Sequence, residues 1–481
     1  MAHAFTGREH ELRELNRLYA KRDFEMVVLY GRRRVGKTTL AFEFAKGKPT
    51  IAFTAKVQSD ALNLADFSRT IFEHFSLPDG GSFPSWENAL AFLAKQAGDS
   101  QLVFVFDEFP YAASKNQSLI STLQVAIDHA LSRTRVFLIL TGSNQGFMEE
   151  KVLGGPGPDG GALGAKNPLF GRRTAQIHLQ PFDYLDAARM LPGTEPERLV
   201  EYYACFGGTP YYLSMIDESE SIEENVARLF FSKEGLLYEE PIMLLRQELR
   251  EPALYSSIMD AIAGGANRPQ AIADRVGDSR TTVGKYLETL RSMGLVSRIA
   301  PFGESSRSSR KCIYRLSDPC FSFWYGFVQP AIDTIERDAG ELVAREAMRT
   351  ERLSTHVGHW FEAICLSWTI RQALAGSLPL SPTAFGSWWG TNARRHERDD
   401  VDVMASNDRL GQLLVGECKW RNGFDESDAL ERLDERAALF PEYGEVWRAL
   451  FTKLAVSSGT VKRHDDGRTL FVSTEELYAN R

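Results

Sequence analysis

The sequence predicts an α/β multidomain protein whose first part is a parallel sheet covered by helices. Short apolar runs alternate there with helix-like stretches, which is typical of strand–helix–strand units. Five or more apolar residues in a row, with no polar alternation, indicate strands buried on both faces. The three clearest of these runs are Met26–Tyr30, Leu102–Phe106 and Val136–Thr141.

Length and composition bound the possibilities before any motif is considered. A chain of 481 residues, 43% hydrophobic and 25% charged, predicts a globular protein of two to four domains. Because no run of 18 apolar residues occurs, we expect no membrane span, and we expect no secretory signal from the residues at the N-terminus. Five cysteines without a CxxC pair favour reduced thiols and the cytoplasm. At a net charge of −8, any binding of nucleic acid must come from a local basic patch.

The first apolar run leads into a glycine loop that fits the phosphate-binding pattern. Two glycines frame the loop, Gly-Lys-Thr closes it, and a helix-like segment, Thr39–Lys46, follows. This setting predicts backbone N–H groups pointing at the phosphates of ATP, with Lys37 on the β- and γ-phosphates and Thr38 on Mg²⁺. The predicted binding residues are Gly31, Arg32, Arg33, Arg34, Val35, Gly36, Lys37, Thr38 and Thr39.

Polar residues end the next two predicted strands. Asp107 would hold the Mg²⁺ shell and Glu108 would polarise the attacking water, because open α/β sheets bind ligands at the carboxyl ends of their strands. After the third strand, either Ser143 or Asn144 can contact the γ-phosphate or the water, and the sequence does not choose between them. A simple turn after the strand is the alternative for both.

A glycine-rich stretch, residues 154–162, predicts a surface loop ahead of Arg172. An arginine there could reach a phosphate in the same chain or across a subunit interface of a homo-oligomer, because its planar fork stays charged. A surface ion pair is the alternative.

The pattern changes along the chain predict four domains. The predicted boundaries are a P-loop ATPase core at 1–184, a helical lid at 185–250, a winged helix-turn-helix at 251–330 and an α/β nuclease-like domain at 331–481. Helices at 196–203 and 221–231 would form the lid over the nucleotide.

The winged helix-turn-helix is predicted from two short helices, 268–276 and 280–294, followed by a hairpin at 295–316. Residues 267–315 hold ten Lys and Arg against four Asp and Glu, so DNA is the expected partner. Packing against the ATPase core is the alternative. The residues predicted to meet DNA are Arg280, Thr281, Thr282 and Lys285 on the second helix and Arg307, Arg310 and Lys311 on the wing.

Two strands near the end carry a second acidic pattern. Asp402 lies in the strand 399–405, and Glu417 and Lys419 lie two apart on the next strand, so they share a face. Hard oxygen ligands beside a lysine suit Mg²⁺ and an activated water. A plain edge strand with alternating charges is the alternative.

Together these motifs resemble the archaeal-type P-loop ATPases of the AAA+/STAND-like branch, which also occur in bacteria. The resemblance covers nearly the whole chain. It is carried by Phe5–Glu9, Gly31–Thr38, Asp107–Glu108, Thr141–Asn144, Leu169–Arg172 and Gly207–Pro210. It implies that Gly7 and Arg8 lie near the adenine and ribose.

The C-terminal part resembles the restriction-endonuclease-like domain of the PD-(D/E)xK type that is often fused to these ATPases. The resemblance implies an acidic metal set of Glu362, Asp402 and Glu417, with Lys419 beside the reacting water. The leading expectation is therefore an ATP-binding, ATP-hydrolysing, DNA-associated protein with a Mg²⁺-dependent nuclease-like domain. Two alternatives remain: a nucleotide-dependent switch or scaffold with an inactive nuclease fold, and a phage-defence or mobile-element effector with regulated cleavage.

Overall fold

A computed structural model describes residues 5–78, 80–154, 167–305, 309–392 and 395–479. The chain divides into two compact units, Met1–Pro181 and Phe182–Arg481, and each is considered by itself. No helix of the described residues is both long and apolar enough to cross a membrane.

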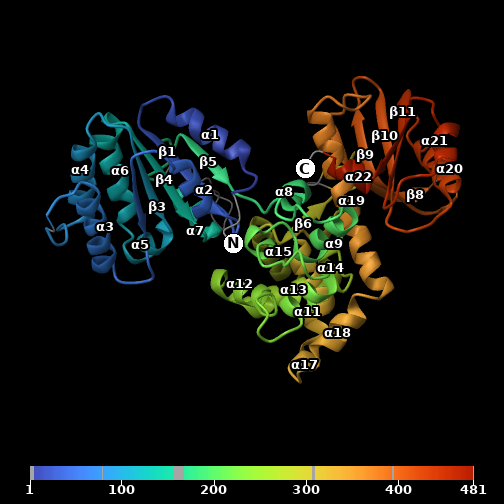
Figure 1. Ribbon diagram of the computed structural model, residues 1–481, viewed down its shortest axis with the longest axis horizontal. Coiled ribbons are helices and arrows are strands. Elements are labelled where there is room, and N and C mark those ends of the chain that lie inside the picture. Colours follow the sequence, from blue (N-terminus) through green and yellow to red (C-terminus); the bar gives the residue numbers. More distant parts are fainter. Residues whose placement is uncertain (1–4, 79, 155–166, 306–308, 393–394, 480–481) are drawn as a thin grey trace. The chain divides into compact units, whose positions relative to one another are not determined.

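The first unit is a five-stranded parallel sheet in the order β2-β3-β4-β1-β5 (Figure 1). This confirms the predicted parallel α/β fold. The strand β4 lies between β1 and β3, so the ends of all three strands meet at one edge. The strands are β1 Glu25–Tyr30, β2 Thr50–Thr54, β3 Leu102–Asp107, β4 Val136–Gly142 and β5 Ala175–His178.

Helices cover both faces of this sheet because successive side chains of each strand point to opposite faces. Val27 and Leu29 pack with α1 and α2, whereas Met26 and Val28 pack with the cluster that α3, α4 and α6 form on the other face. The helices are α1 Glu9–Tyr19, α2 Lys37–Ala45, α3 Asp60–His74, α4 Trp86–Ala97, α5 Phe109–Lys115, α6 Leu119–His129 and α7 Gln145–Phe147.

The second unit begins with a helical region and a small antiparallel hairpin. Its helices are α8 Tyr184–Ala188, α9 Pro196–Phe206, α10 Pro210–Leu213, α11 Ile222–Phe230, α12 Glu240–Glu248, α13 Pro252–Ala263, α14 Pro269–Val276 and α15 Arg280–Ser292. The hairpin pairs β6 Val296–Ile299 with β7 Ile313–Leu316. The α-helices after the hairpin are α16 Pro319–Phe323, α17 Ile332–Ile335, α18 Gly340–Ala347 and α19 Glu351–Leu374.

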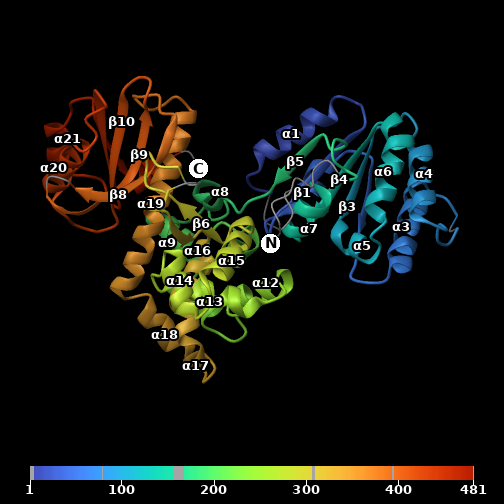
Figure 2. The same cartoon turned by 180° about the vertical axis from the view of Figure 1, so that it is seen from behind.

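A mixed five-stranded sheet of order β12-β11-β10-β9-β8 completes the second unit (Figure 2). The strands β8, β9 and β10 pair antiparallel, whereas β10, β11 and β12 pair parallel. The strands are β8 Ala384–Asn392, β9 Glu397–Asn407, β10 Gln412–Lys419, β11 Glu445–Thr452 and β12 Thr469–Ser473, and the helices are α20 Glu426–Ala437, α21 Ser458–Arg463 and α22 Thr474–Tyr478. This sheet confirms the second α/β region expected from the sequence.

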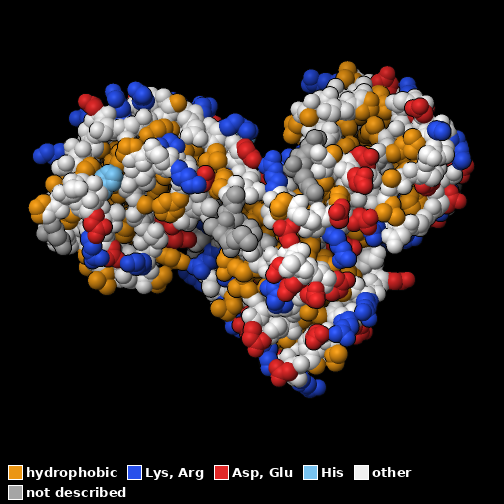
Figure 3. Space-filling view, in the orientation of Figure 1, with side chains coloured by type: hydrophobic (Ala, Val, Ile, Leu, Met, Phe, Trp, Pro, Cys, Tyr) orange, Lys and Arg blue, Asp and Glu red, His pale blue; other side chains and the backbone are white. Residues whose placement is uncertain are grey.

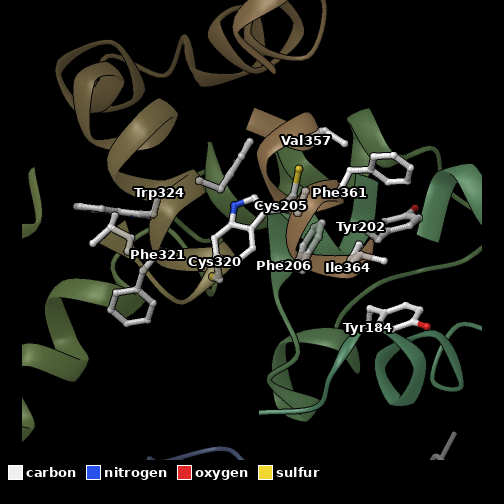
Figure 4. Packing of buried hydrophobic residues seen from close by; sticks show 14 of the residues in the cluster. Tyr184, Tyr202, Cys205, Phe206, Cys320, Phe321, Trp324, Val357, Phe361 and Ile364 are labelled. Carbon is white, nitrogen blue, oxygen red and sulfur yellow. The ribbon is translucent and has the colours of Figure 1, made fainter. Parts of the chain in front are cut away.

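A continuous hydrophobic core runs through much of the second unit, from Phe182 to Tyr478, and a smaller cluster lies between the C-terminal sheet and α20. Figure 4 shows its centre, where Cys205 and Phe206 of α9 meet Val357 and Phe361 of α19. The predicted lid, winged-helix and nuclease-like segments therefore share one core, and the division between them stays a prediction.

Candidate functional sites

The glycine loop between β1 and α2 is held in a shape that demands its glycines. Gly31 has φ +149°, and a Cβ there would lie 2.3 Å from the carbonyl oxygen of Leu179. Gly36 caps α2 in the left-handed region with φ +92°. Glycine enters both conformations at little cost, so the loop can curl at its two ends. Its backbone lies at the N-terminus of α2, where unpaired N–H groups favour anions.

Lys37 lies inside this loop. Its ammonium group donates to the carbonyl oxygens of Gly31 and Arg32, both at 2.9 Å, and its side chain is buried. The loop backbone thus wraps around the Lys37 ammonium group at the carboxyl edge of the sheet. A phosphate group is the natural counter-charge for this arrangement of ammonium and N–H donors.

The carboxylate of Asp107 faces the helix that follows the loop. Its Oδ1 and Oδ2 lie 3.1 and 3.2 Å from the Thr38 hydroxyl, and the Thr141 hydroxyl also donates to it. A hydroxyl beside a buried carboxylate at the phosphate loop fits Mg²⁺, which takes few protein oxygens and completes its shell with water and phosphate. The residues present therefore suit this ion.

Glu108 is held by the end of the neighbouring strand. Its backbone has φ +49°, its N–H donates to the Thr141 hydroxyl at 3.1 Å, and one carboxylate oxygen accepts from the N–H and hydroxyl of Ser143. Asn144 instead caps α7 by accepting from the Phe147 N–H at 2.8 Å. Of the two residues that the sequence left open, only Ser143 touches Glu108.

Arg8 fastens the loop to the end of β5. Its guanidinium donates to the carbonyl oxygens of Val35 and Gln180, at 3.0 and 2.6 Å, and the side chain is buried. Gly7 precedes it in the left-handed region. Arg33 of the loop reaches the hydroxyl of Tyr111 on α5. The proximity of Gly7 and Arg8 to an adenine stays a prediction.

Arg172 is not brought to the loop of its own chain. It makes a two-pronged ion pair with Asp128 at the end of α6, at 2.6 and 2.7 Å. Thr174, two residues on, donates to the carbonyl oxygen of Met26 at the start of β1. Arg172 therefore lies at the amino edge of the sheet, opposite the phosphate loop, because the residues before β5 start where β1 starts. The glycine-rich stretch before it lies largely outside the described residues.

Three residues of this site were given no role by the sequence analysis. Thr141 joins Asp107 to Glu108, Thr54 lies 3.4 Å from Asp107, and His178 stacks on Tyr30 with ring centroids 4.5 Å apart. A polar residue at the end of each buried strand was the available signal. Burial lowers the pKa of His178, so its ring is neutral at pH 7.

The C-terminal sheet places Asp402, Glu417 and Lys419 on two adjacent strands. Lys419 contacts the carboxylate of Glu417, and Asp402 accepts the N–H of Cys418 at 2.8 Å. Burial, together with the charges of Glu362 and Glu417, raises the pKa of Asp402 well above its usual range. Glu362 belongs to α19, and its carboxylate lies 3.6 Å from His359. Among the described residues, no three His, Cys, Asp or Glu side chains form a group that could hold a metal ion.

Arg436 of α20 also joins this cluster, and the sequence analysis missed it. Its guanidinium contacts the Glu417 carboxylate and lies 2.9 Å from Asp399 and 3.8 Å from Asp400. The side chains of Arg436 and Glu417 are only 12% and 8% exposed. The spacing of charges along α20 offered no signal, because ordinary surface helices carry the same pattern.

The helix α15 and the hairpin behind it carry the residues predicted to meet DNA. Arg280, Thr281 and Lys285 are exposed, whereas Thr282 lies beside the capping residue Ser279. On the hairpin, Arg310 is exposed and Lys311 pairs with Glu304 at 2.6 Å, while Arg307 lies outside the described residues. On the face shown in Figure 3, acidic and basic side chains are interspersed.

Comparisons with known proteins bear on both units. Residues 5–216 match the family model of an ATPase domain predominantly from Archaea. Residues 324–434 match a family described as archaeal and bacterial proteins of unknown function. An uncharacterized protein of Methanocaldococcus jannaschii is 28% identical over 420 residues, which cover 87% of this chain and 88% of that protein.

Solved structures show more distant likenesses. A Walker-type ATPase of Pyrococcus abyssi is 19% identical, covers 67% of this chain and 96% of its own, and has a TM-score of 0.48. A point variant of RuvB from Thermotoga maritima is 15% identical over 61% of this chain and 90% of its own, with a TM-score of 0.33. Because both scores are below 0.5, the assignment rests on the family models and the geometry of the site. Residues 5–216 of the chain are thus similar to an archaeal-type ATPase domain, and residues 324–434 are similar to a domain of archaeal and bacterial proteins of unknown function.

Proposed function

We propose that the first unit binds ATP with Mg²⁺ and hydrolyses it in the cytoplasm. The observation that carries this proposal is the meeting of Lys37, Thr38 and Asp107 at one edge of the sheet, with the Thr38 hydroxyl 3.1 Å from the Asp107 carboxylate. An ammonium group, a hydroxyl and a buried carboxylate are the groups that phosphoryl transfer to water requires around the terminal phosphates.

Each residue has a distinct part in this proposal. Lys37 leaves the loop carbonyls and neutralises the β- and γ-phosphates, while the loop N–H groups orient them. Thr38 and Asp107 would hold Mg²⁺, which supplies charge neutralisation at the phosphate oxygens. Glu108 accepts a hydrogen bond from the attacking water and orients it, and Ser143 fixes the direction of that carboxylate.

Steady-state ATP turnover of the full chain tests the proposal. Lys37→Ala removes the ammonium group and should abolish nucleotide binding or turnover. Lys46→Ala is the matched control, because Lys46 lies one residue beyond the other end of α2, is 71% exposed and pairs with Glu43. Equal turnover in Lys37→Ala and the unchanged protein would rule out the phosphate loop as the nucleotide site.

We also propose that the second unit binds duplex DNA through α15 and the β6–β7 hairpin. Support comes from the exposed Arg280, Thr281 and Lys285 at the start of α15, the end that enters a major groove in helix-turn-helix proteins. Binding would rest on phosphate contacts and fall steeply with salt.

Fluorescence anisotropy with a labelled duplex at low salt tests this interface. The double variant Arg280→Ala, Lys285→Ala should weaken binding and lower its salt dependence. Arg291→Ala removes a cation from the last turn of the same helix, where it pairs with Glu288, and should bind as the unchanged protein does. If all three proteins bind equally, or none binds in either nucleotide state, DNA is not the partner of this helix.

A switch or scaffold role for the nuclease-like domain is the second candidate. It is favoured by the ion pair between Arg436 and Glu417, which engages a carboxylate that cleavage would need for a metal ion. In this role the ATP state of the first unit controls how the second unit holds DNA or a protein. Incubation of plasmid with Mg²⁺ or Mn²⁺, with and without ATP, decides between the two roles. Metal-dependent cutting by the unchanged protein that is lost in Lys419→Ala would favour the nuclease role over the switch or scaffold role.

A further inference from the structure

The acidic residues Asp399, Asp402 and Glu417 of the C-terminal sheet form a cluster that also contains a cationic side chain, Arg436. Glu417 and Lys419 lie on the face of β10 that packs on α20, because Leu413 and Val415 of the same strand belong to the α20 cluster. Leu414 belongs to the core that contains α19. The helix α19, which carries Glu362, thus covers the opposite face of the sheet from α20.

Arg436 extends from α20 toward Glu417, which lies on the face of β10 that packs on this helix. Its Nη1 contacts Glu417, its Nε is 2.9 Å from Asp399, and Asn392 donates to the other oxygen of Asp399 at 2.9 Å. One guanidinium thus ties the end of α20 to residues of β9 and β10. Arginine suits this position because its rigid fork can serve several carboxylates at once.

These contacts do not fit a divalent metal ion at Glu417. Its carboxylate is engaged by Arg436 from α20 and by Lys419 from its own strand. A metal ion there would have to approach two fixed positive charges and compete with them for the same oxygens. Of the set Glu362, Asp402 and Glu417 implied by the family resemblance, Glu417 is therefore committed to two cations, Arg436 and Lys419.

We propose that Arg436 is an internal counter-cation that stands in the place of a divalent metal ion and excludes it from Glu417. As folded, the cluster is a structural ion-pair network that fastens α20 to the sheet. It binds Mg²⁺ or Mn²⁺ only when the guanidinium is removed. This proposal concerns the C-terminal sheet alone, so it stands or falls independently of ATP binding by the first unit.

Mn²⁺ binding to the full chain, measured without nucleotide, tests the proposal. Binding is monitored as the loss of the electron paramagnetic resonance signal of free Mn²⁺. Asp402→Asn reports on the cluster, because any Mn²⁺ bound elsewhere remains in that variant. We expect the unchanged protein and Asp402→Asn to bind Mn²⁺ alike. Arg436→Ala should gain a site that is lost again in Arg436→Ala, Asp402→Asn.

Thermal unfolding provides a second readout. Arg436→Ala should melt below the unchanged protein in EDTA, because Glu417 loses a buried partner, and Mn²⁺ should restore part of the loss. If Arg436→Ala does not fold, Arg436→Met keeps the aliphatic stem and takes its place. Mn²⁺ binding by the unchanged protein that Asp402→Asn abolishes would overturn the proposal, as would a folded Arg436 variant that gains no site.

Discussion

Ser143 donates two hydrogen bonds to one carboxylate oxygen of Glu108, from its N–H at 3.2 Å and from its hydroxyl at 2.8 Å. Glu108 follows β3 and Ser143 follows β4, and these strands are neighbours in the sheet. The carboxylate therefore has a fixed direction before any substrate arrives. Such preorganisation limits how far a base or orienting group can wander from its water.

Ser143→Ala should lower kcat for ATP about tenfold while KM changes little, because the backbone N–H still holds Glu108 but the stronger hydroxyl bond is lost. Asn144→Ala is the control, since Asn144 caps α7 and does not touch Glu108. Steady-state ATPase kinetics measure both variants. If kcat fell more in Asn144→Ala than in Ser143→Ala, Asn144 and not Ser143 would be the polar residue that supports hydrolysis.

Glu108→Gln should bind ATP as the unchanged protein does and turn it over about 10²- to 10⁴-fold more slowly. The amide keeps the shape of the side chain but orients the attacking water poorly. Equilibrium binding of a fluorescent ATP analogue and single-turnover hydrolysis separate the two effects. The natural comparison is Glu149→Gln on the segment after α7, which should leave turnover as it is. Normal turnover in Glu108→Gln would remove Glu108 from catalysis.

Arg172→Ala should leave ATP turnover unchanged in dilute protein, because Arg172 lies at the amino edge of the sheet and pairs with Asp128. Its stability should fall by only about 0.2–1 kcal/mol, the usual range for an exposed pair. A concentration series extends the test to assembly. If ATP turnover per subunit rises with protein concentration, and Arg172→Ala abolishes that rise, then the arginine acts on a neighbouring subunit.

Gly208→Ala should destabilise the second unit by about 1–3 kcal/mol. A Cβ at Gly208 would lie 1.8 Å from the carbonyl oxygen of Phe182, whose N–H donates to the Gly208 carbonyl oxygen at 2.7 Å. Gly284→Ala in the interior of α15 is the control, because nothing lies within 4 Å of its Cβ and alanine favours a helix. Thermal unfolding compares them, and equal melting temperatures would contradict the close approach at Gly208.

Stability of the second unit should fall as the pH drops from about 6.5 to about 4. Burial lowers the pKa of His356 to about 4, and its Nε2–H donates to the Ala204 carbonyl oxygen at 2.8 Å. The folded state therefore keeps the ring neutral while the unfolded state binds a proton in this range. Stability is complete above pH 6.5 and is lost as the pH falls, by at most about 3 kcal/mol.

Urea unfolding of the unchanged protein and His356→Gln at pH 5 and pH 7.5 measures this effect. The glutamine amide can still donate to Ala204 but does not titrate, so the difference between the two pH values should shrink. His129→Gln, at an exposed position on α6, should behave as the unchanged protein. An equal pH dependence in all three proteins would exclude His356 as the source.

Local pattern was enough to predict the elements around the loop. The residues 26–30, 102–106 and 136–141 became β1, β3 and β4, because unbroken apolar runs can be buried only inside a sheet covered on both faces. Local pattern did not set the start of α19, which begins at Glu351. Its early turns are helical because Leu353 and Val357 pack into the core, a tertiary gain that the polar residues around them conceal.

The sequence alone predicted the phosphate loop, the acidic carboxyl end of β3, the acidic residues of β9 and the parallel α/β architecture, because each depends on residues that are close along the chain. Tertiary structure decided that Ser143 and not Asn144 meets Glu108, that Arg172 lies at the far edge of the sheet, and that Arg436 reaches Glu417. Those relationships depend on strand order and on the face from which a distant helix approaches. Side-chain periodicity fixes the face within one element, but only packing fixes which other element that face will meet.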